Sequence, residues 1–200
     1  MSATTHPLTR SEHQEKDITT LIGFWVYVMT DCVVFASLFA VFAVLRTRTA
    51  GGPDMAQIVD LPYALVETLV LLASSFTCGM AILSAQHRRR NGVILFLLLT
   101  FLLGATFLTM ELFEFHGLII HGESWHRSAM LSAFFTLVGT HGLHITVGLL
   151  WIAVTIATLF KSGLTRGTTR RLALLSIFWH FLDLVWIFIF TFVYLIGGMH

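Results

Sequence analysis

Residues 93–115 read VILFLLLTFLLGATFLTMELFEF, and the first charged side chain in this stretch is Glu111. A helix rises about 1.5 Å per residue, so the stretch is long enough to cross a hydrocarbon core of about 30 Å. A strand of a membrane barrel would instead alternate apolar and polar side chains over about ten residues. The stretch therefore predicts a membrane-spanning helix.

Four further stretches are also apolar and long enough to cross the membrane. The five expected spans are 21–45, 61–85, 93–115, 129–160 and 172–196. The whole chain is 56% hydrophobic and 12% charged, and that charged share is about half of what a soluble domain carries. The fourth stretch exceeds the required length, so we expect it to tilt or to extend beyond the bilayer. The sequence predicts an all-α membrane protein, a five-helix bundle over residues 21–200 preceded by a polar, disordered tail at 1–20.

Lys and Arg are distributed unequally between the two sides of these spans. The N-terminal segment and the second and fourth connections carry nine, whereas the first and third connections carry three. Basic loops stay in the cytoplasm, so we expect the N-terminus inside and the C-terminus outside. Residues 1–20 lack the pattern of a signal peptide, which predicts that the first span is kept as a membrane anchor. A net charge of +1 with arginines in short loops does not predict nucleic-acid binding.

Eight ionisable residues lie inside the expected spans. They are Asp31, Glu67, Glu111, Glu114, His141, His144, His180 and Asp183. Such residues are costly in a bilayer and usually face protein or water, so they indicate a packed bundle, a larger assembly or a site. We assign them structural or proton-related roles, with no catalytic, cofactor-binding or metal-binding residue among them. For Glu67 and Glu111, a protonated carboxyl that donates an interhelical hydrogen bond is favoured over a proton-exchange or lipid-headgroup site.

Helical spacing suggests how some of these residues are arranged. His141, His144 and Gly148 fall on one helix face, and the missing side chain of Gly148 would let a neighbouring backbone approach closely. His180 and Asp183 are three residues apart, so they could form a buried hydrogen bond on a single helix.

A metal site is the main alternative for these residues, because di-iron bundles gather Glu and His from facing helices. The candidate ligands are Glu67, Glu111-x-x-Glu114, His141-x-x-His144 and His180-x-x-Asp183. Helix rise places Glu67 and Glu111 about 10 Å below the outer boundary, and His144, His180 and Asp183 about 20 Å or more below it. The groups thus form two layers, and the Glu-x-x-His pair of di-iron bundles is absent, which argues against a stand-alone di-iron oxygenase.

Weaker alternatives also remain. His141, His144 and His180 could supply axial nitrogens to a haem. The third connection carries a group of side chains that could bind zinc or copper, although solvated histidines at the membrane interface are the favoured interpretation. That group is His116, His121, Glu123 and His126. A small transporter would be expected to show related halves, and this chain has no internal repeat.

Several motifs in a fixed order resemble a known family. They are GFWVY at 23–27 with TDC at 30–32, LVET at 65–68, LASS at 72–75, GATFLTME at 104–111, EFH at 114–116, GTHGLH at 139–144, WHFLDLVW at 179–186 and YL at 194–195. Together they resemble subunit III of the haem–copper respiratory oxidases over nearly the whole chain after residue 20. Members that oxidise cytochrome c usually have seven helices. Five helices are similar to the short form found in bo-type ubiquinol oxidases.

This resemblance implies an accessory, non-redox subunit of a bacterial proton-pumping terminal ubiquinol oxidase that reduces O₂ to water. The haems and copper would belong to the catalytic subunit I, and this chain would hold no cofactor, although bound phospholipid is possible. Its partners would be subunit I, the other oxidase subunits and the lipids of the bacterial inner membrane. A subunit III of a cytochrome c oxidase or of a nitric oxide reductase stays open. We expect the buried carboxyls and histidines to form interhelical hydrogen bonds that hold a rigid bundle.

Overall fold

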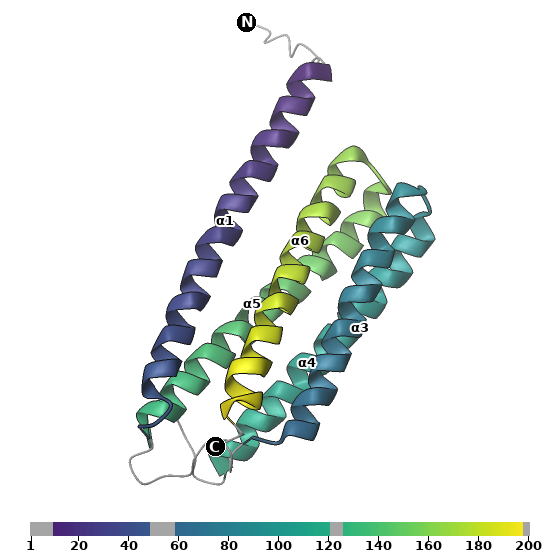
Figure 1. The fold of residues 1–200 in the computed structure, drawn as a ribbon. Coiled ribbons are helices and arrows are strands. Elements are labelled where there is room, and N and C mark those ends of the chain that lie inside the picture. Colours follow the sequence, from purple (N-terminus) through teal and green to yellow (C-terminus); the bar gives the residue numbers. More distant parts are fainter. Residues whose placement is uncertain (1–9, 49–58, 121–125, 198–200) are drawn as a thin grey trace, which may run out of the picture.

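The computed structural model describes residues 10–48, 59–120 and 126–197, and Figure 1 shows their arrangement. The helices are α1 (Arg10–Leu45), α3 (Leu61–Gln86), α4 (Arg90–Ile120), α5 (Ala129–Ser162) and α6 (Arg166–Ile189), and α6 continues into the π-helical η1 (Phe190–Leu195). Five helices of the described chain are long and apolar enough to cross a membrane. The predicted all-α membrane fold with five spans is confirmed.

Local signals in the sequence begin and end these helices. Asp60, Ser128 and Thr165 stand before α3, α5 and α6, and each accepts a hydrogen bond from the backbone N–H three residues later. Such caps satisfy N–H groups that have no partner within the helix. Gly163 follows α5 with φ of 67°, a left-handed conformation that glycine adopts without steric cost.

Several helices extend further than the apolar stretches that predicted them. Because α1 begins at Arg10, residues 10–20 are helical, and the predicted disorder of the tail is wrong there. Residues 1–9 lie outside the described part. The helix α4 starts three residues earlier than expected and ends five later. An apolar stretch reports only the thickness of the hydrocarbon core, whereas a helix can continue into the headgroup region and beyond it.

The helix α6 lies at the centre of the bundle. Helices α3 and α4 form a tight pair on one side of it, and α5 packs against both α4 and α6. On the other side of Figure 1, α1 packs on α5 and α6 through a single stripe of buried side chains. The stripe consists of Val28, Asp31, Phe35 and Phe42. An acidic residue therefore lies within the surface that attaches α1 to the bundle.

Trp179 of α6 is inserted between two glycines of neighbouring helices. A Cβ at Gly104 of α4 would lie 2.8 Å from the indole, and one at Gly148 of α5 would lie 2.9 Å from it. We predicted a close approach at Gly148, and it occurs. The neighbour is an aromatic side chain, however, and the expectation of a neighbouring backbone is wrong. Because glycine has no side chain, the helix that carries it can approach the large indole ring closely.

Candidate functional site

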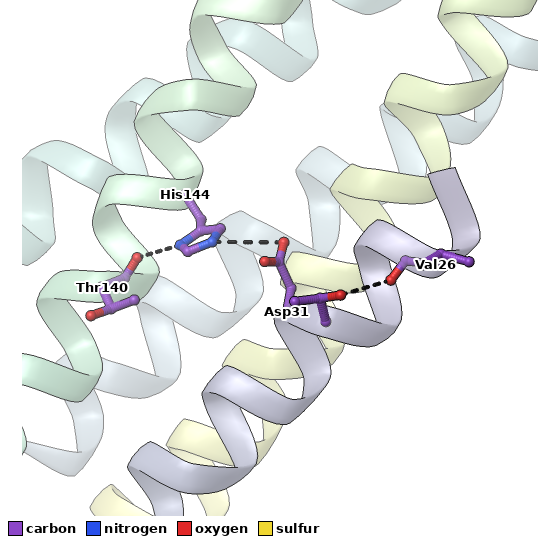
Figure 2. Close-up of polar contacts among 5 residues, drawn as sticks. Val26, Asp31, Thr140 and His144 are labelled. Carbon is purple, nitrogen blue, oxygen red and sulfur yellow. Dashed lines mark hydrogen bonds and ion pairs between the residues drawn. The ribbon is translucent and has the colours of Figure 1, made fainter. Parts of the chain in front are cut away.

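Asp31 of α1 and His144 of α5 point toward each other across the contact between their helices, as Figure 2 shows. The Nε2 of His144 lies 3.7 Å from the Oδ2 of Asp31, and the two side chains are 18% and 11% exposed. The Nδ1 of the same imidazole lies 2.7 Å from the carbonyl oxygen of Thr140, one turn earlier on α5. This contact joins the peripheral helix α1 to the rest of the bundle.

The partners of the imidazole decide which nitrogen carries hydrogen. The carbonyl of Thr140 can only accept, so Nδ1 of His144 is the donor and Nε2 faces the carboxyl. At 3.7 Å the two groups are too far apart for a good hydrogen bond but close enough for an electrostatic attraction. Asp31 and His144 therefore form a loose pair in which removal of one member leaves a polar group without compensation.

His141 lies inside an aromatic enclosure built by three other helices. Its ring stacks on Trp186 of α6 at a centroid distance of 5.4 Å. Phe107 of α4 and Phe35 of α1 meet it edge-on at 6.0 and 6.3 Å. The ring is fully buried, and within the described part of the chain neither of its nitrogens has a hydrogen-bond partner. His141 thus packs as a ring, and the expected interhelical hydrogen bond is wrong.

The carboxyl groups of three glutamates form a cluster near one end of α3 and α4. Glu67 and Glu111 are buried, and Glu67 lies close enough to Glu111 and Glu114 to interact with them electrostatically. Glu114 accepts a hydrogen bond of 2.8 Å from the hydroxyl of Tyr194 in η1. Both carboxyl oxygens of Glu67 lack a hydrogen-bond partner among the described residues. Glu114 thus forms an interhelical hydrogen bond, and its donor is Tyr194 of the YL pair at the end of the last span.

His180 and Asp183 lie on the outer side of α6 and do not bond to each other as predicted. The Nδ1 of His180 instead lies 2.7 Å from the carbonyl oxygen of Ser176 on the same helix. His180 is exposed and Asp183 is half-buried, and both line an open groove between α3 and α6. These two residues face away from the polar interior that holds the glutamates and His141.

Two of the hydrogen bonds that join the helices come from tryptophans of α6. The indole N–H of Trp179 donates to the hydroxyl of Ser74, and that of Trp186 donates to the hydroxyl of Thr68, at 3.1 and 3.0 Å. Both bonds connect α6 to α3. Thr68 was not recognised from the sequence, because a threonine in an apolar helix commonly bonds to its own backbone, and Thr68 does this as well.

Replacing Thr68 by valine is expected to lower the free energy of unfolding by about 0.5–1.5 kcal/mol, because the buried indole N–H of Trp186 loses its acceptor. Thr106→Val is the matched control, since the Thr106 hydroxyl is exposed and bonds only to its own helix at Leu102. The control should change stability by less than about 0.5 kcal/mol. Thermal unfolding in detergent measures both, and equal effects would contradict the role of the Trp186 bond.

Among the described residues, no three His, Cys, Asp or Glu side chains are grouped as a metal ion would require. Asp31 and His144 face each other, whereas the ring of His141 stacks on Trp186. Of the loop candidates, His116 ends up on α4 and His126 stands before α5. His121 and Glu123 lie outside the described residues.

The sequence profile of the family described as cytochrome c oxidase subunit III matches residues 9–198. The chain belongs to this family. The match includes all five spans, so every polar group described above lies within the shared subunit III fold. The predicted resemblance to the subunit III family is confirmed, and the chain is a multi-pass membrane protein.

Some relatives of this subunit III protein are named as quinol oxidase subunits and others as cytochrome c oxidase subunits. Cytochrome bo(3) ubiquinol oxidase subunit 3 of Pseudomonas aeruginosa is 56% identical over 180 residues, which are 90% of this chain and 86% of that protein. Quinol oxidase subunit 3 of Bacillus spizizenii is 44% identical over 177 residues, or 88% and 87% of the two chains. Cytochrome c oxidase subunit 3 of Bacillus sp. (strain PS3) is 41% identical over 176 residues, or 88% and 85%. The similarity is thus greater to the bo-type subunit than to this cytochrome c oxidase subunit.

Proposed function

We propose that this chain is the accessory subunit III of a bacterial bo-type ubiquinol oxidase. The complex would oxidise ubiquinol, reduce O₂ to water and move protons outward across the inner membrane. The single observation that carries the proposal is the 56% identity to a bo(3) ubiquinol oxidase subunit 3 over 90% of the chain. In this proposal the haems and copper belong to catalytic subunit I, and this chain contributes no redox group.

The physical contribution of the chain is a rigid lipid-facing wall beside subunit I. Its central helix α6 is tied to α3 by the two tryptophan bonds and is enclosed by α5 and α1. We assign structural roles to Asp31, His141 and His144, which lie at the contacts between α1, α5 and α6. A wall of this kind would protect proton uptake or oxygen access in subunit I, and bound phospholipid would fill its outer surface.

Purification through an affinity tag on this chain, in mild detergent, tests the proposal. We expect a haem–copper subunit to co-purify, and we expect the complex to show a haem spectrum and ubiquinol oxidase activity. Oxidase assembled without this chain should keep its haem spectrum but lose activity faster during turnover. Haem or stoichiometric iron in the purified chain alone, free of other subunits, would overturn the assignment of a non-redox role.

A second candidate is subunit III of a cytochrome c oxidase, favoured by the 41% identity to the protein from Bacillus sp. (strain PS3). The electron donor of the co-purified complex separates the two. Oxidation of reduced cytochrome c at a rate above that of ubiquinol would support this second candidate. Ubiquinol oxidation alone would support the bo-type assignment.

The proposed orientation places the N-terminus in the cytoplasm and the C-terminus outside. Most basic residues of the described connections lie at the end of the bundle that holds the α3–α4 turn, including Arg88, Arg89 and Lys161. We expect a fluorescent protein fused to the N-terminus to fluoresce and alkaline phosphatase fused to the C-terminus to be active. The reversed pair of fusions is the control and should be dark and inactive. Activity of the reversed pair would place the chain in the opposite orientation.

A further inference from the structure

An open groove with polar side chains runs between α3 and α6 on the outer surface of the bundle. It has a volume of about 770 Å³, and its lining includes Phe76 and Gly79 of α3 and His180 and Asp183 of α6. We call it the α3–α6 groove. Its rim carries apolar side chains that are more than half exposed, such as Leu72 at 54% and Phe76 at 71%.

The polar residues of the groove lie near the middle of the membrane. The last span runs from Arg166 to Leu195, so His180 is fourteen residues from one end and fifteen from the other. Helix rise places it roughly 20 Å from either end of that span. Lipid headgroups are confined to the interfaces, so the groove at this depth faces acyl chains, which neither donate nor accept hydrogen bonds.

Some polar groups of this groove have hydrogen-bonding capacity that the described residues do not use. Because Nδ1 of His180 donates to the Ser176 carbonyl, its Nε2 is left as an acceptor in the neutral ring. The carboxyl of Asp183 adds further acceptor oxygens. Ser75 also lines the groove, and its buried hydroxyl lies close enough to the Asp183 carboxyl to interact with it, although the two do not form a hydrogen bond of good geometry. A buried polar group without a partner costs free energy, and no acyl chain could supply one.

The apolar surface continues past His180 onto a third helix. A second open groove, of about 390 Å³, lies between α1 and α6 and is lined by Trp25, Ser176 and Leu184 as well as by His180. His180 is thus at the centre of a face formed by α3, α6 and α1. An apolar face with hydrogen-bond acceptors at mid-membrane fits a protein helix, because side chains of a helix can provide both packing and donors.

We propose that the α3–α6 groove is where a membrane-spanning helix of a neighbouring oxidase subunit docks. That helix carries a hydrogen-bond donor, an amide, hydroxyl or basic side chain, at mid-membrane opposite His180 and Asp183. The proposal rests on the proposed function as an oxidase subunit and adds the surface and the chemistry of the contact. Leu72 and Phe76 pack against the incoming helix, and the acceptors in the groove determine its register.

Site-directed photocross-linking in the intact oxidase tests the docking surface. In a background with Cys32 and Cys78 replaced by alanine, Gly79→Cys is labelled with a photoactivatable maleimide; a Cβ at position 79 meets no atom within 4 Å. Leu102→Cys on α4, where Leu102 is 54% exposed, is the matched control. We expect at least fivefold more product with another oxidase subunit from position 79 than from position 102. Equal yields, or adducts only with lipid or quinone at position 79, would overturn the proposal.

Substitution of Asp183 tests the polar part of the contact. We expect Asp183→Leu to reduce the haem protein retained on the tagged chain after a stringent detergent wash by at least fivefold. Asp183→Asn keeps an acceptor and should reduce it less than twofold. Thermal unfolding of the purified variant chains separates a lost contact from misfolding. Full retention with Asp183→Leu overturns the donor contact, whereas failure of the unmodified chain to retain any haem protein overturns the proposed function itself.

Discussion

Replacing Gly104 or Gly148 by alanine is expected to destabilise the bundle by about 1–3 kcal/mol each, because either methyl group overlaps the indole of Trp179. At Gly104 the added Cβ would lie 2.8 Å from two indole carbons and 3.1 Å from Leu149. At Gly148 it would lie 2.9 Å from Cζ3, the neighbouring carbon of the same ring. The indole has nowhere to move, since it is 1% exposed and its N–H is bonded to Ser74.

Thermal unfolding in detergent measures this effect, with glycines in open space as controls. A loss of about 2 kcal/mol should lower Tm by about 4–8 °C in a chain of this size. Gly23→Ala and Gly79→Ala meet no atom within 4 Å, and they should leave Tm unchanged or raise it. Alanine is favoured over glycine inside a helix by roughly 0.5–1 kcal/mol. Equal destabilisation at all four positions would show that the helix backbone is responsible rather than the indole.

A second-site change identifies the ring as the cause. Phenylalanine at position 179 removes the part of the indole that contacts Gly104, at the cost of the bond to Ser74. Gly104→Ala should therefore cost less in the Trp179→Phe background than in the unmodified chain. The difference between the two costs is the coupling energy of the pair, and we expect about 1 kcal/mol or more for residues in direct contact. A coupling of zero would place the clash elsewhere.

The spans could be predicted from the sequence because the bilayer imposes a minimum length on any apolar helix. The helix α1 illustrates the limit of this argument, since ten of its first eleven residues are polar and give no signal of a membrane span. Their helicity depends on backbone hydrogen bonds that continue from the membrane-spanning part. The π-helical end of the last span also left no pattern in the sequence. It ends with a bond from the Ile196 N–H to the Thr191 carbonyl, five residues earlier.

The polar residues could be located from the sequence, but their partners could not. Spacing along one helix determines which side chains share a face, as it did for His141 and His144. It does not determine what stands opposite, because the rotation of neighbouring helices depends on packing across the whole bundle. His141 therefore meets Trp186 and Phe107, whereas His144 meets Asp31. No pattern within α5 distinguishes these two surroundings.

The contact between Asp31 and His144 is expected to hold α1 against the rest of the protein. This helix packs mainly on α5 and α6, and the pair lies in the middle of its buried stripe. Asp31→Leu leaves the imidazole of His144 without its electrostatic partner, and His144→Leu does the same to the carboxyl. Each single substitution should lower the free energy of unfolding by about 1–3 kcal/mol, the usual cost of leaving a buried polar group unmatched.

The double variant distinguishes a specific pair from two independent polar residues. If the pair acts as a unit, Asp31→Leu with His144→Leu should cost less than the sum of the single changes, by about 0.5–1.5 kcal/mol. Thr30→Val is the control, since the Thr30 hydroxyl is exposed and bonds only to Val26 of its own helix. Strict additivity of the two leucine substitutions would mean that packing by Phe35 and Phe42, rather than the polar pair, holds α1 in place.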